Sequence, residues 1–253
     1  MTIMNKNVKL LIDVGNSQTK IGIWQNSKLS RVRICNLKKF KKIISTYANL
    51  SYSQILFTSV VSRKNEKFVK ETLISKFTKS PIQIKSSKSL CGVKNSYTQS
   101  TKLGSDRWCA IVGSSLSNRK PVLIVDCGTA VSIDCVCKTG KHLGGFIFAG
   151  YEGYAKSFQR AEKLKNINLI IRSNSKKINY PRNTKDALTL GYIMMITASI
   201  EKIYMKFTED CKEKPVVLLT GAYAKQLEAN LNLDFTHEEN LVLKCLGIIG
   251  DKI

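Results

Sequence analysis

The sequence lacks the residue patterns of several common active sites. Its two histidines, His142 and His237, stand in no arrangement typical of a catalytic triad and are expected to have surface or structural roles. Its eight cysteines include no C-x-x-C pair and no histidine at zinc-ligand spacing. No G-x-x-x-x-G-K-S/T occurs, and no G-x-G-x-x-G follows a predicted strand. These absences argue against a triad hydrolase, a zinc module, a P-loop enzyme and a dinucleotide-binding fold.

Long apolar segments are also missing. The residues before Asp13 contain no long apolar core and no small-residue cleavage site, so no signal peptide is predicted. The charge-free stretch ALTLGYIMMITASI (187–200) is shorter than the ~20 residues that a membrane-spanning helix needs, and it predicts a buried helix. Several cysteines lie in apolar runs such as SIDCVC (132–137), as reduced buried thiols do. We therefore expect a cytoplasmic protein with no membrane partner.

Acidic residues are scarce, since 18 of them face 41 lysines and arginines and the net charge is +23. Such a charge attracts polyanions, which makes nucleic-acid binding one alternative function. However, the 33 lysines far outnumber the 8 arginines that favour specific phosphate and base contacts. The lysines are dispersed, and the densest cluster, KKFKK (38–42), lacks the series of interleaved aromatic residues that stacks successive bases. The composition favours a lysine-coated surface and small anionic substrates.

The chain is long enough for two domains, and the same plan of elements occurs twice. In the first half, β-type runs are predicted at 8–14, 20–24, 28–34 and 54–61. The second half begins with a three-strand meander, and its predicted elements are the meander at 121–150, helices at 151–164 and 184–209, a strand at 215–221 and a closing helix. The polar segment SSLSNRK (114–120) separates the halves. We therefore predict domains at 1–117 and 118–253.

An internal repeat relates the two halves. LLIDVGNSQT (10–19) and LIVDCGTAVS (123–132) both place three apolar residues before an aspartate, with a glycine two residues later. A lone Asp-x-Gly is commonly a turn in which the aspartate bonds its own backbone. Two copies in register favour another interpretation, in which Asp13 and Asp126 lie at strand ends and hold a cation between nucleotide oxygens while turn N–H groups face phosphates.

A third motif lies in YTQSTKLGSDRWCAIVG (97–113), where a predicted helix begins. In a functional interpretation, Asp106 accepts the proton of a substrate hydroxyl and Arg107 neutralises an anion. An acid in the first turn of a helix with a neighbouring surface arginine is equally common. The motif alone therefore leaves both interpretations open.

Together these motifs closely resemble those of type III pantothenate kinase, a family that includes the Bvg accessory factor proteins and belongs to the acetate and sugar kinase, Hsp70 and actin superfamily. The matching stretches run in order along nearly the whole chain: DVGNS (13–17), Tyr97, GSDR (104–107), DCGTA (126–130), GKHLGGFIFAG (140–150) and PRNTKDAL (181–188). The resemblance implies an α/β fold of two ribonuclease-H-like (actin-like) domains. Each domain would have a mixed five-stranded sheet with flanking helices, and the active site would lie in the cleft between them.

The resemblance also implies an activity, the transfer of the ATP γ-phosphoryl group to pantothenate to give 4'-phosphopantothenate. Asp106 would be the catalytic base. The nucleotide would contact Asp13, Val14, Gly15, Asn16, Ser17, Gln18, Thr19, Lys20 and Thr129. Pantothenate would contact Tyr97, Gly104, Ser105, Asp106, Arg107 and Thr184. Asp126 would help to bind a potassium or ammonium ion, Mg²⁺ would accompany ATP, and the protein would be a homodimer.

Three other functions stay open beside this one. A non-catalytic regulator or binding module of the same fold is disfavoured because it would not require all four of the charged residues Asp13, Asp106, Arg107 and Asp126. A basic nucleic-acid-binding protein is supported by charge alone. A sugar or acetate kinase of the same superfamily is disfavoured by the short chain and by GSDR.

Overall fold

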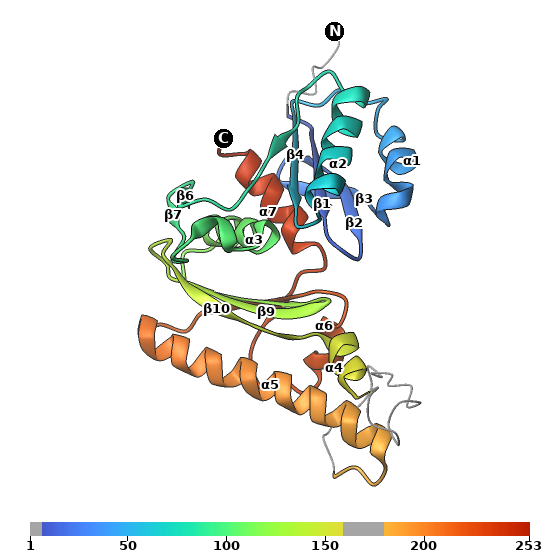
Figure 1. The fold of residues 1–253 in the computed structure, drawn as a ribbon. Coiled ribbons are helices and arrows are strands. Elements are labelled where there is room, and N and C mark those ends of the chain that lie inside the picture. The colour runs from blue at the N-terminus through green and yellow to red at the C-terminus, as the bar shows by residue number, and fades with distance from the viewer. Residues whose placement is uncertain (1–6, 159–179) are drawn as a thin grey trace. The chain divides into compact units, whose positions relative to one another are not determined.

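The computed structural model describes residues 7–158 and 180–253, which form two compact units (Figure 1). Unit 1 contains the described residues up to Arg119, the short segment Thr139–His142 and the C-terminal segment Asn240–Ile253. Unit 2 contains Lys120–Lys138 and the described residues of Leu143–Glu239. Each unit is built around its own five-stranded sheet.

The sheet of unit 1 has the strand order β3-β2-β1-β4-β5. β1 pairs antiparallel with β2 and parallel with β4, so the sheet is mixed as predicted. Its strands are β1 (Lys9–Val14), β2 (Thr19–Gln25), β3 (Lys28–Cys35), β4 (Gln54–Ser59) and β5 (Ile82–Gln83). The helices of the unit are α1 (Phe40–Ser45), α2 (Arg63–Lys76), α3 (Ser105–Ser117) and α7 (Leu241–Gly250), with 3-10 turns at Leu37–Lys39 and Ser100–Lys102 and a small hairpin of β6 (Ser89–Leu90) and β7 (Val93–Lys94).

Strand β1 is buried on both faces of the sheet, which explains its nearly continuous apolar sequence. Leu10, Ile12 and Val14 point to the face that α1 and α2 cover, where they join Phe40 and Leu73 in one core. Residues 9, 11 and 13 alternate to the opposite face. Helices α3 and α7 lie on that side, as Figure 1 shows. The face that carries the side chain of Asp13 is therefore the face toward α3.

Helices α3 and α7 pack closely because glycines stand at their contacts. A Cβ atom added to Gly113 of α3 would collide with the backbone and side chain of Cys245 in α7. One added to Gly247 of α7 would collide with the indole ring of Trp24 in β2. No side chain larger than hydrogen fits at either position without moving backbone or a buried ring. These contacts hold the C-terminal helix against the first sheet.

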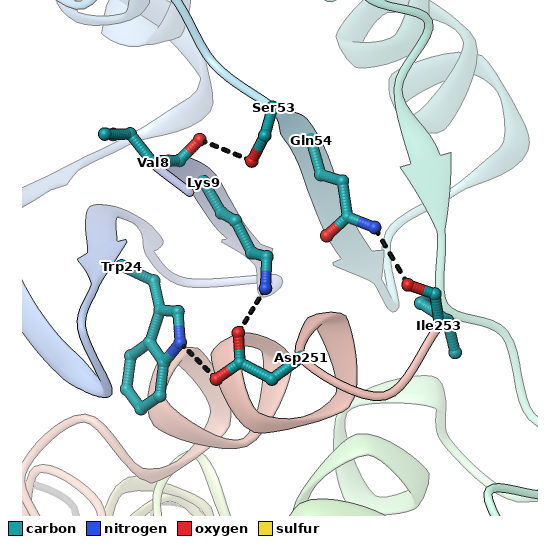
Figure 2. A network of polar contacts seen from close by, with 7 residues as sticks. All are labelled: Val8, Lys9, Trp24, Ser53, Gln54, Asp251 and Ile253. Atoms are coloured by element: carbon teal, nitrogen blue, oxygen red, sulfur yellow. Dashed lines mark hydrogen bonds and ion pairs between the residues drawn. The ribbon is translucent and has the colours of Figure 1, made fainter. Parts of the chain in front are cut away.

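A polar network fixes the end of α7 to the start of β1 (Figure 2). Lys9 is almost fully buried, and its ammonium group pairs with the carboxylate of Asp251, which follows α7. The indole N–H of Trp24 donates to the second oxygen of the same carboxylate at 2.8 Å. The side-chain amide of Gln54 donates to the carbonyl of Ile253 at 3.1 Å. The buried charge of Lys9 is thus satisfied by a residue 242 positions away.

The sheet of unit 2 repeats the first with the strand order β10-β9-β8-β11-β12. β8 pairs antiparallel with β9 and parallel with β11. Residues 123, 125 and 127 of β8 face a core made with the buried side of the long helix α5. The elements are β8 (Val122–Cys127), β9 (Ala130–Val136), β10 (His142–Ala149), α4 (Tyr151–Ser157), α5 (Thr184–Cys211), β11 (Val216–Thr220), α6 (Ala224–Glu228) and β12 (Thr236–His237).

The two mixed five-stranded sheets confirm the predicted fold class, and the unit boundaries differ from the expected division at residue 117. The chain passes from unit 1 to unit 2 after Arg119, returns briefly at Thr139–His142, and enters unit 1 again at Asn240. The closing helix therefore completes the first unit, because its apolar residues pack on α3 and β1. Of the helix predicted at 151–164, residues 151–157 are helical, and residues 159–164 lie outside the described part. Within the described residues, no helix is long and apolar enough to cross a membrane.

The network of Figure 2 predicts that Asp251→Ala destabilises unit 1. The substitution leaves the buried ammonium group of Lys9 without its partner, which costs about 1–3 kcal/mol for an ion pair whose carboxylate is one-third exposed. The midpoint of urea unfolding, read by Trp fluorescence, is expected to fall. Asp210→Ala is the matched control, because it breaks an exposed pair with Lys206 and should change stability by less than about 0.5 kcal/mol. Equal effects of the two variants would contradict the account.

Candidate functional site

The site residues of unit 1 begin with the turn between β1 and β2. Asp13 is the last residue but one of β1, and it lies opposite Lys20 of β2 and Thr58 of β4. The N–H of Gly15 donates to the carbonyl of Gln18 at 3.0 Å, which closes the turn. Residues 16–18 are exposed. The turn thus presents backbone groups to solvent directly beside a half-buried carboxylate, an arrangement that suits an anion with a bound cation.

Two buried hydroxyl groups flank the last residue of β1. Thr19 begins β2 and Ser59 ends β4, and both are register partners of Val14. Each side-chain oxygen is buried without a hydrogen-bond partner in the described part of the structure. An unsatisfied buried hydroxyl costs free energy, so such groups call for an explanation. A ligand at this edge of the sheet would supply one. Thr19 was among the predicted nucleotide contacts, whereas Ser59, which ends an ordinary strand, was not.

The acid of the GSDR motif lies in the first turn of α3. Gly104 is the N-cap residue, and the carboxylate of Asp106 accepts a hydrogen bond from the N–H of Arg107 at 2.7 Å. A Cβ atom on Gly104 would lie 2.7 Å from Oδ1 of Asp106. Glycine at this position therefore leaves the space that the carboxylate occupies. The local sequence fixes the orientation of the acid, and the helix N-terminus stabilises its negative charge.

Arg107 belongs to a cluster with Tyr97 and His142. One guanidinium nitrogen donates to the hydroxyl of Tyr97 at 3.1 Å, and the guanidinium carbon lies 5.8 Å from the centre of the tyrosine ring. The ring of His142 stacks on the ring of Tyr97, with 6.0 Å between the two centroids. His142 is completely buried. Of the two roles expected for it, surface or structural, its burial against Tyr97 fits the structural one.

The loop that carries Tyr97 is held by the side chain of Asn95. Its amide nitrogen donates to the hydroxyl of Ser86 and to the carbonyls of Ser87 and Ser100, at distances of 3.1–3.3 Å. Its oxygen accepts from the N–H of Tyr97 at 3.0 Å. This one amide satisfies the backbone of a segment that has little regular structure, and it keeps the tyrosine in place.

The charges of Asp13 and Asp106 both raise the pKa of one buried thiol, that of Cys109. Burial raises the pKa of Cys109 well above its usual value, and the neighbouring Cys245 and the charges of Asp13 and Asp106 raise it further. Cys109 lies in α3, one turn after Asp106. Asp13 points to the face of the sheet on which α3 and Asp106 lie, so the two acids are on the same side of the sheet. Unit 1 therefore gathers two carboxylates, an arginine and a tyrosine.

In unit 2, Asp126 repeats the position of Asp13. It is the last residue but one of β8, opposite Ser132 of β9 and Thr220 of β11. The N–H of Gly128 donates to the carbonyl of Ala130 at 3.0 Å, so this turn is shorter than that of unit 1. Thr129 is exposed at its tip. The repeated sequence thus folds into the same strand-end carboxylate and glycine turn.

Two glycines pack directly on this second turn. A Cβ atom on Gly150 would collide with the carbonyl oxygens of Gly128 and Thr129. Gly221 has a φ of 99°, in the left-handed region, and lies against the backbone of Cys127. The N–H of Tyr223 then donates to the carbonyl of Cys127 at 3.0 Å. The segments that end β10 and β11 therefore fix the shape of the turn that carries Thr129.

The last predicted site residue, Thr184, is the first residue of α5 and is exposed. The side chain of Asn183 caps this helix by accepting from the N–H of Asp186 at 2.9 Å. Thr184 shares unit 2 with Asp126 and Thr129, whereas Tyr97 and the GSDR residues lie in unit 1. Within residues 7–158 and 180–253, no three His, Cys, Asp or Glu side chains gather as metal ligands.

Comparison with known proteins identifies the relatives of the chain. The family model described as type III pantothenate kinase matches residues 9–206. The type III pantothenate kinase of Nitrosospira multiformis is 27% identical over 241 residues, which cover 95% of this chain and 90% of that protein. The enzyme of the same name from Aromatoleum aromaticum is 31% identical over 170 residues, 67% of each chain. These matches confirm the resemblance that the motifs indicated.

Solved structures share the fold. A conserved Baf family protein of Campylobacter jejuni superimposes with a TM-score of 0.58 at 22% identity, covering 96% of this chain and 98% of that one. The activator of 2-hydroxyisocaproyl-CoA dehydratase from Clostridium difficile, solved with bound ADPNP, has a TM-score of 0.52 at 9% identity, covering 96% and 95%. These neighbours show that the chain has the actin-like fold.

The buried hydroxyl of Thr19 predicts that stability and nucleotide binding respond differently to its removal. Thr19→Val deletes a buried hydroxyl that has no partner in the protein, so the free energy of unfolding is expected to stay level or rise slightly. The affinity for MgATP, measured by calorimetry, is expected to fall roughly 3–10-fold, the effect of one hydrogen bond.

Thr72→Val provides the matched control, since this buried hydroxyl already donates to the carbonyl of Phe68 at 2.8 Å within α2. The control should leave MgATP affinity unchanged. Loss of stability in Thr19→Val with full nucleotide affinity would show that Thr19 has a structural role alone.

Proposed function

Because the chain belongs to the type III pantothenate kinase family, we propose that it transfers the γ-phosphoryl group of ATP to the primary hydroxyl of pantothenate, giving 4'-phosphopantothenate. The family makes it a kinase that uses ATP. The observation that supports the finer assignment is the meeting of Asp106, Arg107 and Tyr97 at the start of α3, on the side of the sheet toward which Asp13 points.

The nucleotide is assigned to the two strand-end turns. Residues 13–20 would bind the phosphates, because the exposed turn at 16–18 presents polar groups beside the carboxylate of Asp13. Thr129, exposed at the corresponding turn of unit 2, would make a second contact with ATP. The two turns come from the repeated sequence, and the assignment gives each of them a role in binding nucleotide.

The acceptor is assigned to the GSDR motif and its neighbours. Arg107 carries the positive charge that pairs with the carboxylate of pantothenate, and Tyr97 holds the guanidinium group by its hydroxyl. Gly104, Ser105 and Thr184 complete the predicted contacts. Asp106 accepts the proton of the attacking hydroxyl, and the N–H of Arg107 keeps its carboxylate in place for that step.

Phosphoryl transfer requires mainly positioning and neutralisation of charge, and the acids of the site fit this chemistry. Asp13 would help to hold Mg²⁺, because this ion takes oxygen ligands from one or two carboxylates and from phosphates, and the bound ion would supply charge neutralisation. Asp126 offers a half-buried carboxylate beside a tight turn, and it would help to hold potassium or ammonium. The cytoplasmic location expected from the sequence stays a prediction.

A homodimer is proposed from the outer face of α5. Residues three, four and eleven positions apart lie on one side of a helix. Here that side is exposed and mostly apolar, with Lys202 between Ala198 and Met205, although the opposite side is in the core. More than half of the Met194 and Met205 side chains is exposed. The outer face comprises Ala187, Gly191, Met194, Ala198 and Met205. An exposed apolar strip of this kind fits a second copy of the chain.

The proposal predicts that ATP is consumed in step with pantothenate when Mg²⁺ and potassium or ammonium are present. In Asp106→Asn, turnover is expected to fall roughly 10²–10⁴-fold while MgATP affinity is kept, because the amide cannot accept the proton. A coupled ADP-release assay and calorimetry measure the two quantities.

Glu66→Gln is the matched control for Asp106→Asn. Glu66 is also an acid in the first turn of a helix, α2, and its only expected loss is an exposed pair with Lys85. The control should keep full turnover. If both variants turn over normally, Asp106 is an ordinary helix-terminal acid; if the unaltered protein makes no phosphopantothenate at millimolar ATP, the enzyme assignment fails.

The proposed dimer predicts that Met194→Glu yields monomers in sedimentation experiments, because the charge would be buried in the apolar contact. Ile74→Glu is the control, since Ile74 has similar exposure on α2 of unit 1 and should leave the dimer intact. A monomeric unaltered protein, or a Met194→Glu variant that stays dimeric, would contradict this interface.

A further inference from the structure

Two partly exposed thiols of unit 2 lie in direct contact. The sulfur atoms of Cys137 and Cys211 are 3.2 Å apart, although 74 residues separate them in the sequence. Cys137 directly follows β9, and Cys211 is the last residue of α5. A disulfide bond is about 2.05 Å long, so little more than 1 Å of movement would join the two sulfurs.

The surrounding structure holds the two segments beside each other. Lys138, the residue after Cys137, pairs with Glu213 at 3.0 Å. Between Cys211 and Glu213, Lys212 has a φ of 53° and turns the chain out of the helix. The ion pair joins the residue after Cys137 to the residue two positions after Cys211. Together with the defined end of α5, it supports the contact between the two sulfurs. Both cysteines therefore lie in segments that other contacts hold in place.

We propose that Cys137 and Cys211 form a redox modification site, in which hydrogen peroxide converts the two thiols to a disulfide that ties the end of α5 to β9. In the first step the sulfur of Cys137, as thiolate, attacks one peroxide oxygen; the O–O bond breaks, a sulfenic acid forms, and the hydroxide that leaves becomes water with the proton that the thiol lost. The sulfur of Cys211 then attacks that sulfenic sulfur and displaces hydroxide, which takes up the proton lost from Cys211. Two thiols lose two electrons and two protons in total, and one peroxide becomes two waters.

The order of the steps follows from the surroundings of Cys211. Burial, the hydrogen bond to Cys137 and the nearby charges of Asp210 and Glu213 raise the pKa of Cys211 to about 12. Cys211 lies within two residues of Asp210 and Glu213, whose negative charges disfavour a thiolate there, so Cys211 is the poorer first nucleophile. We accordingly assign the first oxidation to Cys137, and Cys211 resolves the sulfenic acid because it is already in contact.

A third thiol provides a competing product. Cys135 lies on the same face of the chain as Cys137, two residues earlier, but it belongs to the buried core. Burial raises its pKa to about 12, with Asp134 and Cys211 contributing. Cys135 is therefore shielded from peroxide, and the cross-link is expected between the partly exposed pair.

The cross-link would stabilise unit 2 without reaching the residues assigned to the substrates. It closes a loop of more than 70 residues, which restricts the unfolded chain. Thr184 stands at the other end of the 28-residue α5, about 40 Å away along the helix axis. The expected effect is a higher melting temperature of the oxidised protein.

The test uses the full chain, reduced and then treated with hydrogen peroxide. Remaining thiols are alkylated under denaturing conditions, and peptides are mapped by mass spectrometry. We expect two of the eight thiols to be lost and a cross-linked peptide containing Cys137 and Cys211, lighter by two hydrogens than its parts. The melting temperature should rise by several degrees and return after reduction.

Cys137→Ser and Cys211→Ser should each lose both the cross-link and the thermal shift. Cys91→Ser is the matched control, because it removes a partly exposed thiol of unit 1 and should keep both effects. Three results would overturn the proposal: eight thiols that all stay reduced, a cross-link that involves Cys135, or sulfinic acids in place of a disulfide. None of these measurements depends on kinase activity, so they stand apart from the proposed function.

Discussion

A carboxylate at the penultimate position of a central strand, followed at once by a glycine turn, is the constraint on which both units depend. Asp13 and Asp126 sit at the ends of strands that lie buried between two neighbours and are mainly apolar. A charged group is tolerated there because the sheet ends and solvent or a ligand can reach it. The turn must then bend sharply away, which leaves polar backbone groups beside the charge. Each sheet therefore has the same carboxylate and glycine turn at the end of its central strand.

The rest of unit 1 adds a second acid to that edge. Helix α3 lies across the face to which Asp13 points, and its first turn brings Asp106 toward the same buried thiol, Cys109. The helix is kept there by α7, whose glycine contacts and buried Lys9–Asp251 pair fasten it to β1 and β2. The C-terminal segment is thus part of the structural support of the acceptor site, although it supplies none of the predicted site residues.

Local patterns in the sequence predicted the strands, the fold class and the repeated strand-end acids, because alternation, length and turn residues are local properties. The return of α7 to unit 1 was not predicted. It depends on Gly113 and Gly247 meeting partners far away in the chain, and a glycine within a helix gives no indication of such a contact.

The same limit applied to individual residues. Ser59 reads as the end of an ordinary strand, and the burial of His142 against Tyr97 follows from the path of the β9–β10 turn. Cys137 and Cys211 belong to no motif, and only folding brings their sulfurs together. What the sequence could not provide was, in each case, a contact between distant segments.

The central proposal is that the strand-end acids Asp13 and Asp126 both serve nucleotide binding, and a double-mutant cycle on MgATP affinity tests it most directly. Asp13→Asn, Asp126→Asn and the double variant would be titrated with MgATP by calorimetry at fixed potassium concentration. Two groups that act on one bound nucleotide are expected to be coupled, so the free-energy changes should depart from additivity by more than about 0.5 kcal/mol. Strict additivity, or no effect of either substitution, would contradict the account.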